Sequence, residues 1–567
     1  MTEPRPSGAR FVALGILLSK VFGLVRETVI GRIFGVGPHA DVFRYALRAP
    51  NVLQNLLGEQ TLSAAFIPIY SRLLQEGRRD EAGRFAGAVF GLLLAVVAAL
   101  VLLGILLAPV IVSVLAAGLS GDAARVAAGE MEVDRFPLTV RAVRIIFPMT
   151  GFLVLSAWAL GVLNSHRRFL LPYMAPIAWN AAIVTAVLAA AGRSGLLGAP
   201  GEAGLKTVEG WLFAAFWGAL AGGLLQFAVQ LPLVLKLLGG LEASLSTRVT
   251  GVRDALRAVG PAIAGRGVVQ LSIYLDIFLA SFLRSGAPGA LGFAAVLYNL
   301  PLAAFGMSIA AAELPELSRA GDTAGGGTAG GGPAGGGPAG GRRIVERIDR
   351  ALRQAAFVVC PSVVGYLLFG FLVVGLIYGG GAFTREDNWL VYAILAGYTL
   401  GLLASTVSRL LQNAFFALRD TRTPAKIAAL RLLVSAAAGV GWMLFFDRFP
   451  VAETLGLAGA GKGLRFGALG LALASSAGAW CELALLRRRL RERLPELRLP
   501  ARHILGRLLS ATALSLPVLG IWAVLAGRSL TVQALAVLPA YAALYLGWAW
   551  WRRLPELDLW LGRFGRR

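Results

Sequence analysis

Long apolar stretches separated by short polar loops recur along almost the whole chain. A window of about 19 residues finds about fourteen of them, at residues 10–33, 39–74, 82–116, 136–164, 171–191, 209–238, 253–284, 290–318, 347–379, 387–418, 425–447, 465–486, 503–526 and 532–551. A helix needs about 20 residues to cross the hydrocarbon of a bilayer, so each stretch is long enough to cross once. Open strands would leave backbone groups unpaired in lipid. The pattern therefore predicts an all-α polytopic membrane protein with about fourteen transmembrane helices.

Composition agrees with this class. Of 567 residues, 57% are hydrophobic and only 15% are charged, and the mean hydropathy is +0.70. A soluble globular domain is far less apolar. The chain is also basic, with 54 Lys and Arg against 31 Asp and Glu. In a soluble protein this excess would suggest a nucleic-acid partner, so the placement of the charges decides its meaning.

The basic residues gather in the loops that follow even-numbered stretches. They are Arg72, Arg78, Arg79, Arg84, Arg167, Arg168, Arg342, Arg343, Arg347, Arg350, Arg353, Arg419, Arg422, Lys426, Arg487, Arg488, Arg489, Arg491 and Arg493. The alternate loops carry far fewer, and cytoplasmic loops are the ones enriched in Lys and Arg. Both termini are therefore predicted to be cytoplasmic. The net charge of +23 is then a topology signal and an attraction to anionic membrane lipids, and no nucleic-acid partner is needed to explain it.

Catalytic and metal-binding patterns are absent from the sequence. His39, His166 and His503 are isolated from one another, and Cys360 and Cys481 lie far apart in apolar runs. Neither set has the spacing of a metal site or a disulfide framework. No Gly-rich loop ending in Lys-Ser or Lys-Thr occurs, which argues against ATP hydrolysis. The sequence therefore favours a transporter over an enzyme.

Two similar segments suggest a doubled plan. "GVLNSHRRFLLP" (161–172) ends the fourth stretch and "NAFFALRDTRTP" (413–424) ends the tenth, six stretches later. Parallel repeats of this kind are a common transporter construction, with the substrate between the halves. We predict two six-helix lobes around a central cavity, 1–240 and 241–490, followed by two C-terminal helices and a basic tail in 491–567. The Gly/Pro-rich tract 321–341 is expected to be a flexible cytoplasmic linker.

Charged residues in the first two stretches are the strongest functional signal. An Arg or Lys in the middle of a bilayer costs about 2.5–3.5 kcal/mol and usually faces a bundle interior or a wet cavity. Residues spaced by three, four or seven positions share one face of a helix. Two such stripes occur, one of Ser19 and Arg26, with Lys20 beside Ser19, and one of Asp41, Arg44 and Arg48, continued past Pro50 by Asn55 and Glu59.

These stripes allow two interpretations. In the first, they line a hydrated cationic cavity for an anionic substrate, because Arg grips phosphate oxygens with paired donors and keeps its charge. In the second, Arg26 pairs with Asp41 or Glu59 to hold helices together, while Arg32 and Arg44 extend to the membrane interface.

Further charges in the fourth and seventh stretches fit the same cavity. They are Arg141, Arg144, Arg257, Arg266 and Asp276. For the seventh stretch, an Arg–Asp pair within the membrane explains the residues as well as substrate contact does.

Several long segments, in order, resemble one family. "SKVFGLVRETVIGRIFGVGPHADVFRYALRAPNVLQNLLGEQTLSAAFIPIYS", "GVLNSHRRFLLPYMAPIAWN", "LYNLPLAAFGMSIAAAELPELSR" and "NAFFALRDTRTPAKI" resemble the MurJ (MviN) family, the lipid II flippases of peptidoglycan synthesis. The resemblance covers most of the first twelve stretches. It implies the fold of the multidrug/oligosaccharidyl-lipid/polysaccharide exporter superfamily, with two lobes around a central cavity and a lipid-tail groove on the last two helices.

The resemblance also implies a substrate, a location and roles for individual residues. The substrate would be lipid II, undecaprenyl-pyrophosphoryl disaccharide-pentapeptide, carried across the bacterial inner membrane by alternating access, with cell-wall synthesis proteins as further partners. Arg26 matches a pyrophosphate-binding arginine, Ser19 a cavity serine, and Asp41 and Glu59 important acidic positions. Asp276 matches a sodium-binding position of some relatives, and Na⁺ and H⁺ both stay open as the coupling ion.

The chain departs from the family pattern at several cavity positions. Lys20 stands where many relatives have Arg, Gln54 and Asn55 replace an Arg pair, and the Arg and Glu of the eighth helix appear as Val296 and Asn299. We expect Arg48, Arg257 or Arg266 to supply the missing charge. Two other functions stay open: a drug or glycolipid exporter of the same superfamily, and a transport-silent scaffold for cell-wall proteins.

Overall fold

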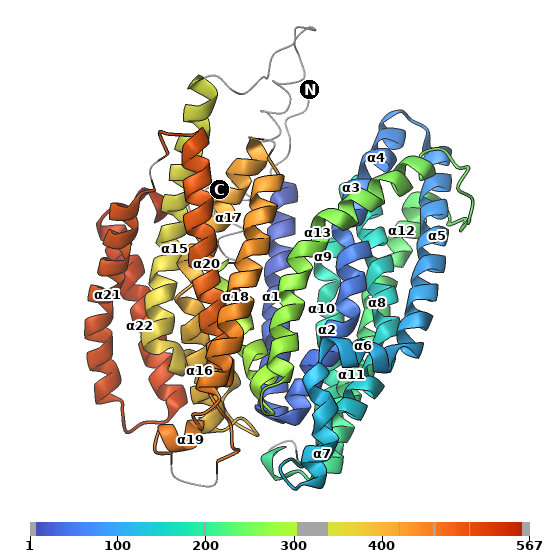
Figure 1. Ribbon diagram of the computed structural model, residues 1–567. Coiled ribbons are helices and arrows are strands. Elements are labelled where there is room, and N and C mark those ends of the chain that lie inside the picture. The colour runs from blue at the N-terminus through green and yellow to red at the C-terminus, as the bar shows by residue number, and fades with distance from the viewer. Residues whose placement is uncertain are drawn as a thin grey trace. The chain divides into compact units, whose positions relative to one another are not determined.

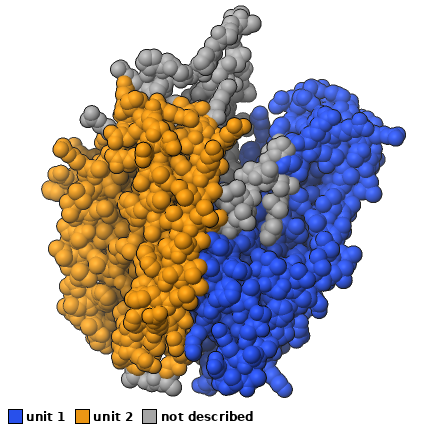
Figure 2. Space-filling view, in the orientation of Figure 1, with its two compact units in different colours: residues 1–289, 381–383 blue, residues 290–380, 384–567 orange. Residues whose placement is uncertain are grey.

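The computed structural model describes residues 7–196, 200–302, 338–418, 420–457, 461–497 and 499–557. Within these ranges the chain is helical apart from turns, short irregular segments and isolated bridges, one of which joins Pro450 and Arg465. It divides into two compact units, coloured separately in Figure 2. Unit 1 is Met1–Gly289 with Gly381–Phe383, and unit 2 is Ala290–Gly380 with Thr384–Arg567. The all-α membrane fold expected from the sequence is confirmed.

Unit 1 is built around one long buried helix, α8. Its helices are α1 (Ser7–Phe34), α2 (Pro38–Leu57), α3 (Glu59–Ala65), α4 (Ile67–Gln75), α5 (Arg79–Leu106), α6 (Ala108–Leu115), α7 (Asp122–Ala127), α8 (Arg135–Ser165), α9 (Leu170–Met174), α10 (Pro176–Arg193), α11 (Leu205–Ala228), α12 (Leu231–Leu238) and α13 (Val252–Ser281), with 3₁₀ turns at Ala117–Gly121 and Pro200–Glu202. Helix α8 packs against α2, α5 and α11 (Figure 1). Its Trp158 is fully buried beside the ring of Phe90.

Unit 2 has two packing centres. It contains the short helix Ala287–Leu302 from Ala290 on, and then α15 (Pro338–Tyr378), α16 (Arg385–Thr399), α17 (Leu402–Ala417), α18 (Arg422–Phe446), α19 (Val451–Thr454), α20 (Gly467–Arg493), α21 (Ala501–Val524) and α22 (Leu530–Trp551). Helix α20 packs against α16, α17 and α18. Helices α21 and α22 pack against each other and against α15 (Figure 1).

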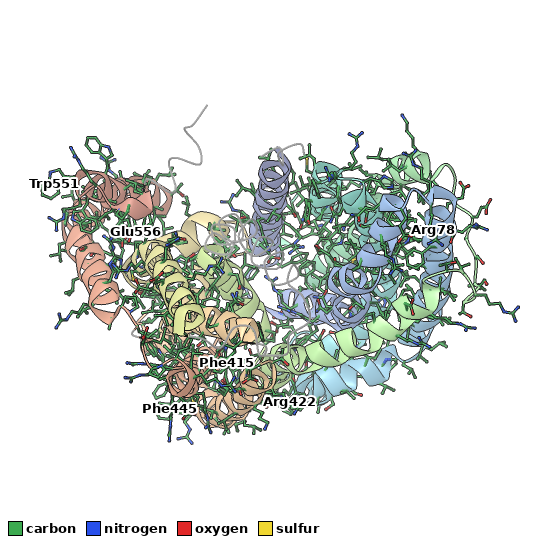
Figure 3. All side chains as sticks on the ribbon, turned by 90° about the horizontal axis from the view of Figure 1, so that it is seen from above. Arg78, Phe415, Arg422, Phe445, Trp551 and Glu556 are labelled. Atoms are coloured by element: carbon green, nitrogen blue, oxygen red, sulfur yellow. The ribbon has the colours of Figure 1, made fainter. Side chains whose placement is uncertain are left out.

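The distribution of apolar side chains in unit 2 is that of a membrane protein. Phe415 is fully buried among the helices, as Figure 3 shows, and contributes to the core of α15, α17 and α20. Trp551 is 72% exposed at the rim of the same view, and Leu433 on α18 is 66% exposed. Large apolar side chains on an outer surface are stable when that surface faces lipid.

The expected number of spans is not confirmed. Among the described residues, nine helices are long and apolar enough to cross a membrane, or up to eleven if two bent pairs each count as one. Helices α1, α2 and α13 are not among them, and each carries several charged residues. All fourteen apolar stretches nevertheless contain helix, although residues 303–318 of the eighth lie outside the described part of the chain.

The linker expected at 321–341 needs a correction at its end. Residues 321–337 lie outside the described ranges. Pro338 already begins α15, which runs without a break to Tyr378. The basic segment that follows the tract is therefore the first part of the same helix, α15.

Candidate functional site

A buried carboxylate holds two guanidinium groups together where α1 and α2 lie side by side. One Glu27 oxygen accepts a hydrogen bond from Arg26 Nη2 at 2.5 Å, and the other accepts one from Arg44 Nη2 at 2.5 Å. The Glu27 side chain is 1% exposed and both arginine side chains are 13% exposed. The group, named here the α1–α2 cluster, contains two positive charges and one negative charge.

The turn between α1 and α2 explains why these residues meet. Helix α1 ends at Phe34, and Gly35 takes the left-handed conformation with φ +62°, which glycine adopts at little cost. Helix α2 starts at Pro38, where proline fits the first turn. Arg26 lies about 12 Å before the end of α1 and Arg44 about 9 Å after the start of α2, at 1.5 Å per residue. The hairpin therefore brings both side chains to a similar depth.

An aromatic ring on α10 supports Arg26 from the other side. The Arg26 guanidinium carbon lies 4.8 Å from the centre of the Trp179 ring, a cation–π contact. Trp179 is itself oriented by a hydrogen bond from its Nε1 to the Met149 sulfur at 3.2 Å. Arg26 Nε is buried and has no hydrogen-bond partner among the described residues. Arg26 is thus held in a fixed position, and at least one of its N–H groups is not used in a hydrogen bond with the described residues.

A second buried cluster surrounds Asp41. Its carboxylate accepts hydrogen bonds from Arg135 Nη1 at 2.9 Å and from the backbone N–H groups of Gly286 and Gly289 at 2.7 and 2.8 Å. Arg135 also donates from Nε and Nη2 to Asp122 at 2.6 and 3.0 Å. Asp41, Asp122 and Arg135 are fully buried. This cluster ties α2 to the start of α8 and to the turn after α13.

A third cluster lies within unit 2. Glu482 on α20 is 2% exposed and accepts hydrogen bonds from Gln412 of α17 at 2.8 Å and from Arg431 of α18 at 2.6 Å. It joins three helices of unit 2.

Among the residues that the structure describes, no group of three or more His, Cys, Asp or Glu side chains could hold a metal ion.

Comparison with known proteins identifies the family. A sequence model of the family described as "Lipid II flippase MurJ" matches residues 30–543, which is most of the chain. The chain belongs to the MurJ family. The resemblance noted from its motifs is therefore confirmed, and the family is one of transporters rather than enzymes.

Individual MurJ relatives agree over most of their length. A lipid II flippase MurJ from Burkholderia cenocepacia is 31% identical over 423 residues, which cover 74% of each chain. A probable lipid II flippase MurJ from Rhizobium tropici is 30% identical over 458 residues, covering 79% of this chain and 77% of the relative. With the membrane-spanning helices, these matches make the chain a multi-pass protein of the inner membrane.

Solved structures support the fold. A lipid II flippase MurJ in an inward closed conformation matches with a TM-score of 0.68 at 20% identity, covering 95% of this chain and 98% of that one. An inward-facing multidrug resistance MATE family transporter of the MOP superfamily matches with a TM-score of 0.58 at 14% identity, covering 86% and 98%. At these identities the likeness concerns the fold alone.

The residues expected to form a MurJ-type substrate site have different surroundings. Ser19, Arg48, Asn55 and Asp276 are half-buried, Lys20 and Glu59 are exposed, and the side chain of Arg266 lies outside the described part of the structure. Arg48 and Asn55 each have contacts within the protein. These assignments stay predictions.

Three expectations need correction. Arg26 pairs with its neighbour Glu27 rather than with Asp41 or Glu59. Arg44 does not extend to the interface, because it is 13% exposed and bound to Glu27. Asp41 shares no open face with Arg44, since its carboxylate is fully buried in the second cluster.

The structure also describes the surroundings of three other charged residues that were expected in the cavity. Arg141 stacks on the Phe213 ring at 4.4 Å, and Arg144 is exposed. Arg257 lies 3.8 Å from Asp254 in an exposed ion pair near the start of α13. Arg257 therefore already has an acidic partner within one helical turn.

Proposed function

We propose that this protein is a lipid II flippase that moves undecaprenyl-pyrophosphoryl disaccharide-pentapeptide from the inner to the outer leaflet of the bacterial inner membrane. Membership of the MurJ family supports lipid II as the substrate. The observation that carries the proposal is the α1–α2 cluster, because it keeps a net positive charge inside an apolar helix bundle. An anionic headgroup is the ligand that such a charge favours.

The cluster suits a pyrophosphate in particular. Arg26 uses one Nη2 donor on Glu27 and its Nε has no hydrogen-bond partner among the described residues, and a guanidinium has five N–H donors in a planar fork. The remaining donors can bind phosphate oxygens in pairs. Because both arginines are fixed by Glu27, little side-chain entropy is lost when the substrate binds. Ser19, Lys20, Arg48, Asn55, Glu59 and Arg266 are proposed as further contacts of the substrate.

An apolar pocket in unit 2 offers room for part of the lipid tail. It has a volume of about 350 Å³ and lies between α15 and α22, where it is lined by residues that include Phe357, Pro361, Tyr366, Tyr541 and Tyr545. This volume falls within the range of about 300–1,000 Å³ that is usual for ligand pockets. We propose that the isoprenoid chain of the substrate occupies it.

Topology and energy coupling follow from the same function. The basic loops support cytoplasmic termini, so that substrate enters from the side on which it is made.

A membrane potential supplies about 2.3 kcal/mol per charge per 100 mV, which can bias the transport cycle if the bound charge moves. Na⁺ and H⁺ are the candidate coupling ions, with Asp276 as the proposed ion-binding or ion-pairing residue.

Rescue of cells depleted of their own lipid II flippase tests the proposal. We expect the wild-type protein to restore growth, Arg26→Gln to fail, and Arg26→Lys to rescue weakly because it keeps the charge but loses the paired donors. All variants need equal membrane levels, and Arg488→Gln in the exposed basic end of α20 is the matched control. Failure of the wild-type protein would favour export of another substrate. Full rescue by Arg26→Gln would favour the scaffold.

A further inference from the structure

One charged side chain within a membrane helix of unit 2 has no partner among the residues that the structure describes. Helix α17 buries Leu410, Leu411 and Phe415 against α15 and α20. The opposite face is open, with Arg409 and Asn413 both exposed. They are four residues apart, so they lie on the same side of the helix, one turn from each other. Arg409 makes no hydrogen bond or ion pair with any residue that the structure describes.

The position of Arg409 along the helix makes contact with lipid tails unfavourable. It lies eight residues before Ala417, the last residue of α17, which is about 12 Å at 1.5 Å per residue. Residues 402–417 contain no other charged residue. The hydrocarbon core is about 30 Å thick, and an arginine within it usually faces a protein interior or water. The open side of α17 is therefore expected to be hydrated.

Two acidic residues close to α17 in the fold or the sequence, Glu482 and Asp420, are bound to other partners. Glu482 is bound to Arg431 and to Gln412, which follows Arg409 by about one turn of α17. Asp420, beyond the end of the helix, is bound to Arg493 at 2.7 Å. No acidic residue in the described part of the chain therefore pairs with Arg409, which leaves its positive charge available to an anion.

We propose that Arg409, assisted by the Asn413 amide, is a second anion-binding position, which holds the pyrophosphate of the lipid-linked substrate on unit 2. The inference rests on the proposed function. A guanidinium and an amide one turn apart can donate to neighbouring phosphate oxygens. The helix Ala287–Leu302 of the same unit has no charged residue, so it provides no cation for this role.

Binding of purified lipid II to the full-length protein in phosphatidylcholine nanodiscs tests Arg409. We expect Arg409→Gln to weaken binding roughly tenfold to hundredfold, since a hydrogen bond to a charged group is lost. Arg409→Lys should fall between this variant and the wild type, because it keeps the charge without the planar fork. Arg488→Gln, which removes an exposed charge from α20, should bind as the wild type does.

Two further arms separate the proposal from its alternatives. Phosphatidylglycerol carries the same phosphate chemistry, so its binding is measured in parallel. If Arg409→Gln weakens phosphatidylglycerol binding and leaves lipid II binding unchanged, Arg409 serves bulk lipid and the proposal is wrong. If the wild-type protein does not bind lipid II, the proposed function fails. If the wild type binds and Arg409→Gln, with an unchanged thermal midpoint, binds equally well, only the role of Arg409 is refuted.

Discussion

Replacing Glu27 with glutamine removes one negative charge from between two arginines and changes the side-chain shape very little. Glu27 is 1% exposed and contacts Arg26 and Arg44 at 2.5 Å each. A glutamine at this position can accept a hydrogen bond from only one guanidinium, while its own N–H₂ group would face the other. Two buried cations would then lie close together without an anion.

The size of the effect follows from the burial of the three groups. Two unit charges 4 Å apart interact by about 4 kcal/mol at an effective dielectric constant of 20, and the regained solvation of the lost carboxylate offsets part of this. Breaking a buried ion pair by removing one partner costs about 3–5 kcal/mol. We expect Glu27→Gln to destabilise the protein by about that amount. Arg44→Gln leaves the pair with Arg26 intact, so it should cost only about 1.5–3 kcal/mol.

The double variant decides whether the charges act together. In Glu27→Gln with Arg44→Gln, Arg26 still lacks its anion but has no second cation beside it. The double variant should therefore lose less free energy of unfolding than the sum of the two single losses, by about 1–3 kcal/mol, as expected for residues in direct contact. Denaturant unfolding of the wild type, both single variants and the double variant in one detergent gives the cycle. Additivity within about 0.5 kcal/mol would refute the cluster as a coupled unit.

Three other predictions concern the remaining structure. Asp41→Asn removes one of the two carboxylates that face a buried guanidinium on α8, and we expect it to cost about 1.5–3 kcal/mol, because the Arg135–Asp122 pair stays intact; an unchanged unfolding midpoint would contradict this. Gly470→Ala should destabilise the packing of α18 on α20 by about 1–3 kcal/mol, because an added Cβ would lie 2.4 Å from the backbone of α18. Gly441→Ala is the control, since a Cβ there would enter open space and should not destabilise the protein. The pKa of Asp420 lies below its ordinary value because the side chain and the backbone N–H of Thr423 donate hydrogen bonds to its carboxylate. The ionised carboxylate therefore stabilises the folded protein fully at neutral pH, and this stabilisation is lost as the pH falls through the lowered pKa. Asp420→Ala should therefore lower the unfolding midpoint at pH 7 and have less effect in acid; an equal effect at both would contradict the assignment.

Hydropathy was sufficient to predict where helices occur, because lipid leaves a buried backbone few other options. It was not sufficient to predict where helices bend. The stretch 82–116 continues into a helix pair bent by 102°, between Ala108–Leu115 and Ala117–Ala127. Gly118 follows that bend, and a Cβ there would lie 2.2 Å from the carbonyl oxygen of Ser281. A hydropathy window averages over neighbouring residues, so it does not reveal the single glycine that permits this close approach.

The candidate site was predictable in part. The cost of charge in lipid correctly marked Arg26 as a residue that needs a polar environment. Its partner Glu27 was missed, because adjacent residues on a helix do not normally face each other. Here Arg26 binds its neighbour Glu27, which also binds Arg44 on α2. A helix face derived from spacing shows which residues share a direction, but not what lies opposite them.

Long-range pairing was the feature least accessible from sequence. Arg135 comes directly before the apolar stretch 136–164, where hydropathy predicts a loop, yet it is fully buried between Asp41 and Asp122. Asp41 and Arg135 are 94 positions apart. A charged residue near the end of an apolar stretch has the same local pattern whether it meets water or a distant carboxylate, so spacing alone cannot separate the two cases.

Charge balance distinguishes the two clusters of unit 1 and explains why only one of them is suited to a substrate. The cluster around Arg135 has two carboxylates and one guanidinium, and the backbone N–H groups of Gly286 and Gly289 provide the remaining donors to Asp41. All of its charged side chains are fully buried, so an incoming ligand would have to break existing bonds. The α1–α2 cluster has the opposite balance, with one more cation than anion and partial exposure of both arginines. An anion that reaches it adds the missing negative charge, and for this reason the α1–α2 cluster is the better candidate for binding the pyrophosphate.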